Sequence, residues 1–291
     1  MKNLASSNPE IHFKEVGFNE LPAILSNLKK DWPHSIHTYY FLLNFVNWTK
    51  QHWNGEFNFY CPDVGSSTKS VMAVVKFKDG HTFVQYHCLD EVSCKSIHKA
   101  IKHTNVLHWD QLLIFEAIHE RLVPGLQEII QEKGLRVIKN DKCFQVWMPP
   151  TRVRSLNESL PPQITLCSLD GNHTQQIHRY WGYSGPGTEV IVRDSLTLNG
   201  GLGLRIGKNH SYVGWSVEQH YGGIGMLYVH PEYRRQGYAA ALVKTMGKQA
   251  VLKGIDPFAI IEENNNMSRN LFEKLHFEHI CTVHWIGVQA G

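Results

Sequence analysis

The chain has 291 residues, of which 42% are hydrophobic and 19% are charged. This length allows two domains with proper cores, and the composition is ordinary for a globular protein. The formal net charge of +3 is small and does not indicate a nucleic-acid-binding protein, which would need a concentrated basic face. The sequence has no apolar run long enough to span a bilayer, and residues 1–16 lack the apolar core of a signal peptide.

The cysteines and histidines are scattered rather than clustered. No C-x-x-C or zinc-finger spacing occurs, and the histidine pairs His98/His103 and His276/His279 lack a third ligand. We therefore expect no metal, reduced thiols and an intracellular location, either cytoplasmic or mitochondrial. The six cysteines are Cys61, Cys88, Cys94, Cys143, Cys167 and Cys281.

The first half of the chain alternates between strand and helix patterns. Asp79-Gly80 is a strong hairpin signal between two β runs, and the aromatic residues of the segment 39–53 indicate core packing rather than a ligand site. The predicted order is a strand at 11–16, helices at 19–30 and 39–53, strands at 69–77 and 81–88, and a helix at 91–103.

Residues 112–148 are predicted to contain helices and a closing hairpin. The apolar run 112–115 leads into helical spacing that continues to Ile130, with Pro124 forcing a kink or a break. Residues 135–138 and 143–148 read as two strands of a hairpin that turns across 139–141.

Residues 149–162 read as a linker rich in Pro, Ser and Asn, and Asn157 begins a glycosylation-like triplet that an intracellular protein would leave unused. A strand at 164–169, a helix ending at Trp181 and a glycine-rich loop at 182–187 follow. The next predicted strands are 188–193, 203–206 and 211–217, with turns at 199–201 and 207–209.

Residues 222–253 are the most informative stretch, because they predict a strand, a glycine loop and a helix in succession. Pro231 ends the apolar strand 226–229, and helix-forming residues begin at Tyr238. The unpaired N–H groups and dipole of a helix N-terminus favour phosphate, and Gly237 lets the backbone approach a ligand closely. The loop therefore suits a pyrophosphate, with Arg234 and Arg235 adding positive charge.

The spacing Arg234-x-x-Gly237-x-Ala239 resembles the phosphate loop of the GNAT superfamily of acyl-CoA N-acyltransferases. The preceding Val229 to Arg234 fits the pattern V-x-P-E-x-R of that superfamily. Residues 265–277 match its downstream motif, with Ser268 in place of Ala, Phe272 in place of Tyr and His276 in place of Gly. Two motifs in the expected order make a chance match improbable.

Trp215-Ser-Val217, ahead of the Pro-Glu-Tyr-Arg strand, resembles the glycine N-acyltransferase family, whose members also carry a long N-terminal half. The resemblance implies an α/β (α+β) GNAT fold with a mixed, mostly antiparallel central sheet flanked by helices. The order of elements before residue 148 suggests a degenerate GNAT-like duplicate, and an unrelated α/β domain is the alternative. We expect a degenerate domain at 1–148, a linker at 149–162 and an acyl-CoA-binding GNAT domain at 163–291.

The resemblance implies acyl-CoA, such as acetyl-CoA, as co-substrate. Backbone N–H groups around Leu227 to Val229 would polarise the thioester carbonyl, and those of Arg235 to Ala239 would hold the pyrophosphate. The cofactor-binding candidates are Leu227, Tyr228, Val229, Arg234, Arg235, Gln236, Gly237, Tyr238, Ala239, Asn265, Ser268 and Phe272.

The proton-transfer groups of the relatives are missing from their expected places. The glutamate of the glycine N-acyltransferase pattern falls at Gly223, and the tyrosine that many GNAT enzymes use as an acid falls at Phe272. Glu218, His220 and Tyr221 are the nearest catalytic substitutes, and a histidine has a suitable ordinary pKa. Each of the three is equally readable as a solvated turn residue.

The sequence therefore predicts an N-acyltransferase that moves an acyl group from acyl-CoA to the amine of a small acceptor such as glycine or another amino acid. The alternatives are a CoA-binding protein with little catalytic activity, which Gly223 and Phe272 favour, and a protein or peptide N-acetyltransferase. The expected partners are acyl-CoA and the amine, without nucleic acid or a membrane span. The oligomeric state is left open.

Overall fold

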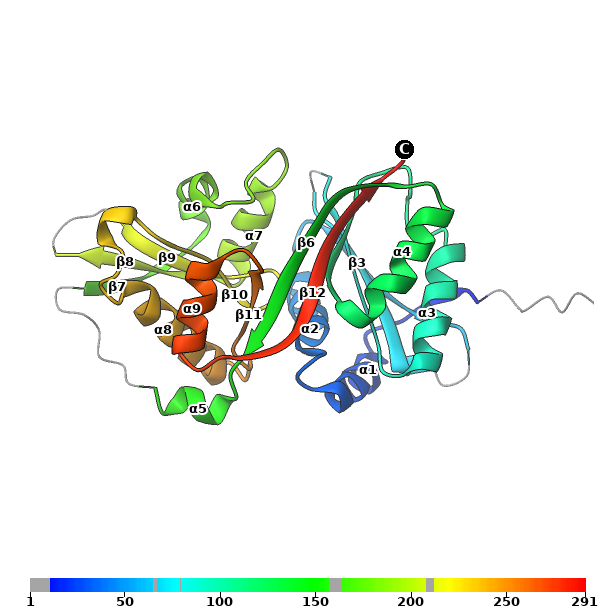
Figure 1. The fold of residues 1–291 in the computed structure, drawn as a ribbon, viewed down its shortest axis with the longest axis horizontal. Helices are drawn as coiled ribbons and strands as arrows, with labels where there is room; N and C mark the ends of the chain where they lie inside the picture. Colours follow the sequence, from blue (N-terminus) through cyan, green and yellow to red (C-terminus); the bar gives the residue numbers. More distant parts are fainter. Residues whose placement is uncertain (1–10, 65–66, 79, 157–163, 208–211) are drawn as a thin grey trace, which may run out of the picture.

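The computed structural model describes residues 11–64, 67–78, 80–156, 164–207 and 212–291. The chain forms two lobes, one from each half of the sequence, joined by two long strands (Figure 1). The elements of the first half are β1 (Phe13–Glu15), α1 (Leu21–Leu28), α2 (Ile36–Lys50), β2 (Glu56–Pro62), β3 (Ser70–Lys76), β4 (Thr82–Cys88), α3 (Glu91–His103), β5 (Leu113–His119), α4 (Val123–Glu132) and β6 (Arg136–Trp147).

The second half repeats the same order of strands and α-helices. After the short helix α5 (Pro150–Arg154), its elements are β7 (Ile164–Leu169), α6 (Thr174–Tyr180), α7 (Glu189–Leu198), β8 (Gly201–Ile206), β9 (Tyr212–Glu218), β10 (Ile224–Val229), α8 (Tyr238–Leu252), β11 (Phe258–Glu262), α9 (Asn266–Lys274) and β12 (Glu278–Gln289). Because both halves run β-α-α-β-β-β-α-β-α-β, the expected duplication is confirmed.

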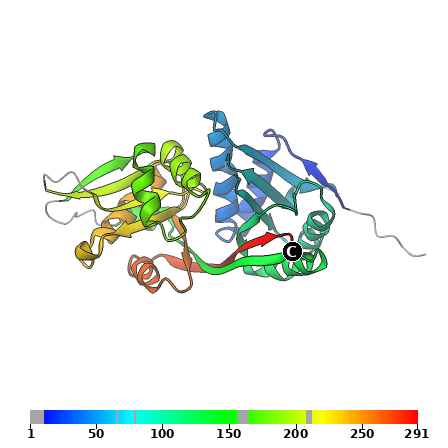
Figure 2. The same ribbon diagram turned by 90° about the horizontal axis from the view of Figure 1, so that it is seen from above.

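The two halves exchange their last strands. One sheet has the order β1-β2-β3-β4-β5-β12-β6-β11, and the other has the order β10-β9-β8-β7. The final strand, β12, therefore lies between β5 and β6 of the first half, and β6 lies between β11 and β12 of the second (Figures 1 and 2). The domain boundaries at 148 and 163 stay a prediction, and β12 from the second half pairs with β5 and β6 of the first.

Helix α2 packs between the lobes and explains the aromatic segment near residue 45. Phe41, Phe45 and Trp48 are fully buried, as a core helix requires. On the side of the second half, Trp48 Nε1 donates to Asn199 Oδ1 at 2.7 Å and Asn44 Nδ2 donates to the His220 carbonyl at 2.6 Å. The interface is therefore both apolar and hydrogen-bonded.

Three predicted elements differ from the structure. Residues 188–193 were expected as a strand but begin helix α7, which buries Val190, Ile191 and Val192 together. The predicted hairpin over 135–148 is the single strand β6, because its full length pairs with β12. The run from 113 to 119 is strand β5, and Pro124 lies in the first turn of α4, where its missing N–H costs nothing.

The expectation of reduced thiols is wrong for two cysteines. Cys88 at the end of β4 and Cys94 in α3 form a disulfide, their Cα atoms lying 5.3 Å apart. The other four cysteines are free. Asp79 of the predicted hairpin, the Asn157 triplet and residues 208–209 lie outside the described residues. No helix in the described ranges has both the length and the apolar character to cross a bilayer.

Candidate functional site

The two sheets part between β10 and β11. Each of these strands is the edge of its own sheet, so their facing backbones are not hydrogen-bonded to each other. A bulge also interrupts the pairing of β10 with β9 between Gly225 and Tyr228, and Met226 adopts a left-handed conformation at φ +47°. An edge strand carries unpaired N–H and C=O groups, which can bind a ligand that enters the gap.

The loop after β10 presents an uncapped helix N-terminus. Gly237 is the N-cap of α8 with φ +83°, and no side chain caps this helix. Arg235, at φ +61°, is exposed and makes no hydrogen bond or ion pair within the described part of the chain. Arg234 instead turns back, and its Nε donates to the Val229 carbonyl at 2.9 Å. The loop therefore leaves backbone N–H groups and Arg235 available to an anion.

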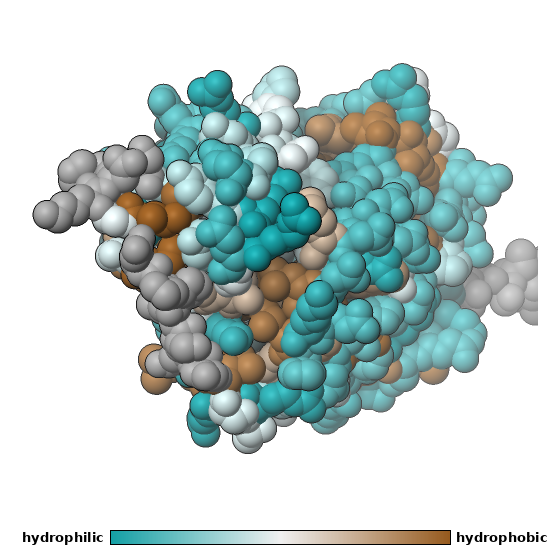
Figure 3. Space-filling view, turned by 60° about the vertical axis from the view of Figure 1, so that its left-hand side comes forward, coloured by the Kyte–Doolittle hydropathy of each residue, from teal (hydrophilic) through white to brown (hydrophobic). Residues whose placement is uncertain are grey.

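A cavity of about 400 Å³ lies behind this gap. Its wall combines β10, β11 and α9 of the second half with Phe83 and Ile114 from strands of the first half. Trp285 of the exchanged strand β12 also lines the cavity. Charged groups in the wall are Lys139, Asp141 and Glu262. On the face that the second half presents in Figure 3, apolar residues lie between surrounding hydrophilic ones.

The structure divides the predicted cofactor residues into two groups. Asn265 caps α9 through a bond from the Ser268 N–H at 3.1 Å, and Phe272 is buried against Phe277. The residues of the phosphate loop lie outside the cavity wall, as does Val229. The predicted cofactor residues that line the cavity are Leu227, Tyr228, Asn265, Ser268 and Phe272.

The three catalytic candidates have different surroundings. Glu218 does not line the cavity; its carboxylate pairs with Lys253 Nζ at 2.7 Å, and burial raises its pKa against the opposing effect of Lys253. His220 and Tyr221 both line the cavity and are 3% exposed. Burial raises the pKa of Tyr221 well above its usual value, so this hydroxyl keeps its proton. None of the three is a solvated turn residue.

Glu116, which the sequence analysis missed, contacts the cavity-lining His220. Its carboxylate on β5 is fully buried and lies 2.9 Å from His220 Nε2 and 3.0 Å from His37 Nε2. Burial alone would raise the pKa of Glu116, but the contacts with the two histidines outweigh burial and hold the pKa below its usual range. The available signal was a single carboxylate inside the otherwise apolar run from Leu112 to Ile118.

The two departures from the family pattern have structural reasons. A Cβ at Gly223 would lie 2.5 Å from Cε2 of Tyr221, so the buried tyrosine ring occupies the space that a longer side chain would need. Phe272 packs edge-on against Phe277, with ring centroids 4.9 Å apart, and has no proton to give. The usual acid and base are therefore absent from these two positions.

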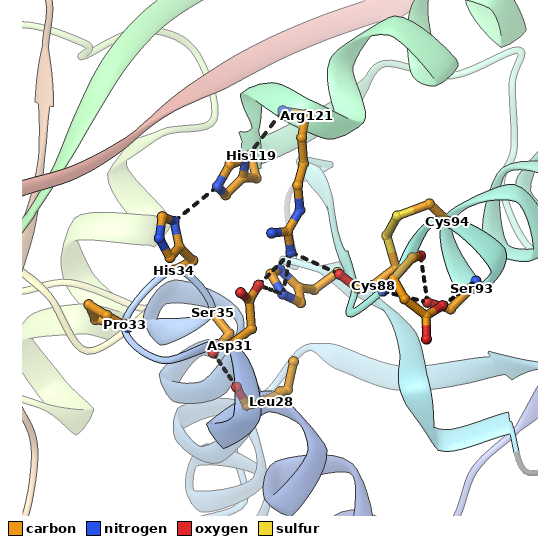
Figure 4. Close-up of polar contacts among 12 residues, drawn as sticks. Leu28, Asp31, Pro33, His34, Ser35, Cys88, Ser93, Cys94, His119 and Arg121 are labelled. Atoms are coloured by element: carbon orange, nitrogen blue, oxygen red, sulfur yellow. Dashed lines mark hydrogen bonds and ion pairs between the residues drawn. A yellow bond between two sulfur atoms is a disulfide. The ribbon is translucent and has the colours of Figure 1, made fainter.

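The corresponding region of the first half is closed. There β4 and β5 pair directly over Thr82–Val84 and Leu113–Phe115, and two residues connect β4 to α3. Asp90 caps that helix by accepting from the Ser93 N–H at 2.8 Å. Beyond the pairing, Arg121 contacts Asp31 and donates to the Cys88 carbonyl at 2.9 Å (Figure 4).

One group of possible metal ligands, His34, His119 and Cys281, lies in this closed region among the described residues. His119 Nδ1 accepts from the Arg121 N–H at 3.2 Å, so the neutral ring carries its proton on Nε2. That proton faces His34 Nδ1 at 3.2 Å (Figure 4). The hydrogen bonds use the nitrogen lone pairs that a metal ion would need.

Both halves of the chain match family models. Residues 201–286 match the model described as FR47-like protein, and residues 13–129 match Domain of unknown function (DUF5645). The chain is 19% identical over 208 residues to glycine N-acyltransferase from Bos taurus, which covers 66% of this chain and 70% of that enzyme.

Solved structures share the fold at low identity. A Drosophila protein superimposes with a TM-score of 0.84 at 18% identity, covering 96% of this chain and 98% of its own. A tandem GNAT protein from the clavulanic acid biosynthesis pathway gives a TM-score of 0.54 at 13% identity, with coverage of 96% and 98%. These similarities show that the chain has a GNAT fold, which occurs once in each half.

Proposed function

We propose that this protein transfers an acyl group from acyl-CoA to the amine of a small acceptor such as glycine or another amino acid. The observation that carries the proposal is the unpaired gap between β10 and β11, which opens from an uncapped phosphate loop into the cavity. The similarity to the bovine enzyme supports an amino-acid acceptor.

The parts of the site suit the two substrates. The N–H groups before Ala239, with Arg235, would bind the CoA pyrophosphate, and the edge of β10 would hold the acyl-pantetheine arm. The N–H groups near the bulge at Met226 would stabilise the oxyanion that forms on the thioester carbonyl. The cavity wall carries two carboxylates, those of Asp141 and Glu262, and one ammonium group, that of Lys139. This excess of negative charge favours a cationic amine in the cavity.

The proposal is tested by release of free CoA thiol. The protein is mixed with acetyl-CoA or benzoyl-CoA and a panel of amino acids and amines. Release that depends on the acceptor, with the N-acylated product identified by mass spectrometry, is the expected result. Absence of release with every acceptor would contradict it.

A second candidate is a CoA-binding protein with little catalysis. It is favoured by Gly223, where the Tyr221 ring takes the space of a longer side chain, and by Phe272, which has no proton to give. The same assay separates the two, because this candidate binds acyl-CoA tightly in a direct titration without releasing thiol. An intracellular location and a small acceptor, rather than a protein, belong to the same proposal.

A further inference from the structure

The active-site cavity contains a buried histidine whose second nitrogen has no partner. His220 is in the turn between β9 and β10, its side chain is 4% exposed, and it lines the cavity. Its Nε2 lies 3.1 and 2.9 Å from the two oxygens of Glu116. Its Nδ1 is buried and forms no hydrogen bond with the described residues. A buried polar atom left unpaired costs about 1–3 kcal/mol, so it needs an explanation.

The carboxylate determines which nitrogen of His220 carries the proton. An ionised carboxylate only accepts hydrogen bonds, so Nε2 is the N–H donor and the neutral ring keeps a lone pair on Nδ1. His37 shows the same arrangement, because its Nε2 faces Glu116 and its Nδ1 accepts from the Gln85 amide at 3.0 Å. Burial lowers the pKa of His37, so this second histidine is neutral and leaves the carboxylate charge uncompensated.

The carboxylate of Glu116 faces His220 directly. The titratable groups around it are Glu116 from β5, His37 from α2 and Tyr221, the next residue, which keeps its proton. Four aromatic rings also pack against the imidazole; they belong to Phe41, Phe45, Phe77 and Phe83. An imidazole that is oriented by a buried carboxylate can act as a general base, and the carboxylate itself does not take up the proton.

Resting on the proposed function, we propose that His220 is the catalytic base that deprotonates the acceptor ammonium, and that Glu116 of the first half is its positioning residue. The closed half thus supplies part of the catalytic machinery of the open half. The wall of the cavity likewise includes strands of both halves.

The acceptor ammonium loses two protons on the way to the amide. His220 Nδ1 takes one proton from R–NH₃⁺, and the neutral nitrogen attacks the thioester carbon, forming the C–N bond. The tetrahedral oxyanion collapses, the C–S bond breaks and CoA leaves as thiolate. The second proton lost by the nitrogen ends on that thiolate, and His220 returns the first proton to solvent. No oxidant or further reactant is needed.

The test compares His220→Gln and Glu116→Gln with His87→Gln. The control fits closely, because His87 is also a buried imidazole, 2.8 Å from the carboxylate of Asp31, but lies outside the cavity wall. We expect kcat to fall about 100-fold or more in His220→Gln and at least tenfold in Glu116→Gln, with unchanged affinity for acyl-CoA. His87→Gln should keep the wild-type kcat.

A chemical readout separates catalysis from structural damage. Methoxyamine is unprotonated at neutral pH and needs no base, so the kcat deficit of both variants should shrink to within about threefold with this acceptor. The deficit with amino acids should also narrow as the pH rises, because more of the amine is already neutral.

The outcomes distinguish this inference from the proposed function. Absence of thiol release by the wild type overturns both. Wild-type turnover with unchanged kcat in His220→Gln, or an equal deficit with methoxyamine, overturns only the base. If His220→Gln fails to fold, the pH dependence of kcat in Glu116→Gln decides. Loss of the carboxylate that stabilises the imidazolium should move the acidic limb of that profile to lower pH. An unmoved limb contradicts the assignment.

Discussion

The two halves share one order of elements but differ where β4 and β10 lead into the following helix. In the first half two residues make the connection, the disulfide of Cys88 crosses it, and Asp90 caps the helix. In the second half eight residues, His230 to Gly237, make the connection and no side chain caps the helix. A helix N-terminus binds an external anion only while no internal carboxylate occupies it. The same fold is therefore stabilised in one half and kept open in the other.

The strand pairing follows the same contrast. Pairing of β4 with β5 closes the space that stays open between β10 and β11. The polar cluster around Arg121 and Asp31 then fills the closed half beyond that pairing (Figure 4). Substitutions at the closed β4–α3 connection and at the open β10–α8 connection should therefore affect different properties.

The largest effect on stability is expected from Ile286→Ala in the last strand. Ile286 is 1% exposed and packs in the core of the first half, because β12 is exchanged. We expect the free energy of unfolding to fall by about 3 kcal/mol. Ile138→Ala, at an exposed position of β6, should change it by less than about 0.5 kcal/mol in the same urea titration. Equal losses would show that β12 is not part of that core.

The largest effect on binding is expected from Gly237→Asp, which copies Asp90 into the open half. A left-handed backbone costs a non-glycine residue about 1–2 kcal/mol, and the new carboxylate would repel the pyrophosphate. The dissociation constant for CoA, measured by calorimetry, should rise on the order of 100-fold.

Gly134→Asp is the matched control for this substitution. Gly134 has φ +64° at the end of α4, and a Cβ there meets no atom within 4 Å. Both variants should lose stability, but Gly134→Asp should bind CoA normally. Wild-type affinity in Gly237→Asp would mean that the loop is only structural.

A smaller effect is expected from Asp31→Asn in the closed half. Burial alone would raise the pKa of Asp31, but the contacts with His87 and Arg121 outweigh burial and hold the pKa well below its usual value. The folded-state pKa is depressed, so the stabilisation is complete above about pH 4 and is lost as the pH falls. The variant should lose about 2 kcal/mol at pH 7, and the difference from wild type should narrow below pH 4. A difference that is constant with pH in urea titrations would contradict this.

An effect on stability of similar size is expected from the double variant Cys88→Ser/Cys94→Ser. The disulfide closes a loop with a sequence separation of 6, for which chain entropy predicts about 2 kcal/mol. We expect the Tm to fall by several degrees while CoA affinity is unchanged. Reduction of the wild type with dithiothreitol should lower its Tm equally and leave the variant unaffected. A loss of CoA binding would show that the closed connection influences the open one.

Local patterns predicted the backbone structure of the loop before α8 well. The strand, Gly237 and the helix from Tyr238 depend on neighbouring residues, since a turn and a helix start are decided within a few positions. The duplication was readable for the same reason, from the order of elements. The helix α7 was misread because its residues Val190 to Val192 suit a strand equally well, and burial against the sheet decided between them.

The sequence by itself determined the GNAT fold, the glycine turn before α8 and the two-fold repeat, because these reside in short-range spacing and in the order of elements. Only the tertiary structure decided that β12 and β6 are exchanged, since pairing between strands far apart in the chain leaves no mark on either strand alone. It also decided that Glu116 meets His220 across 104 positions of the chain. A contact between two halves depends on how their sheets pack, which no local pattern encodes.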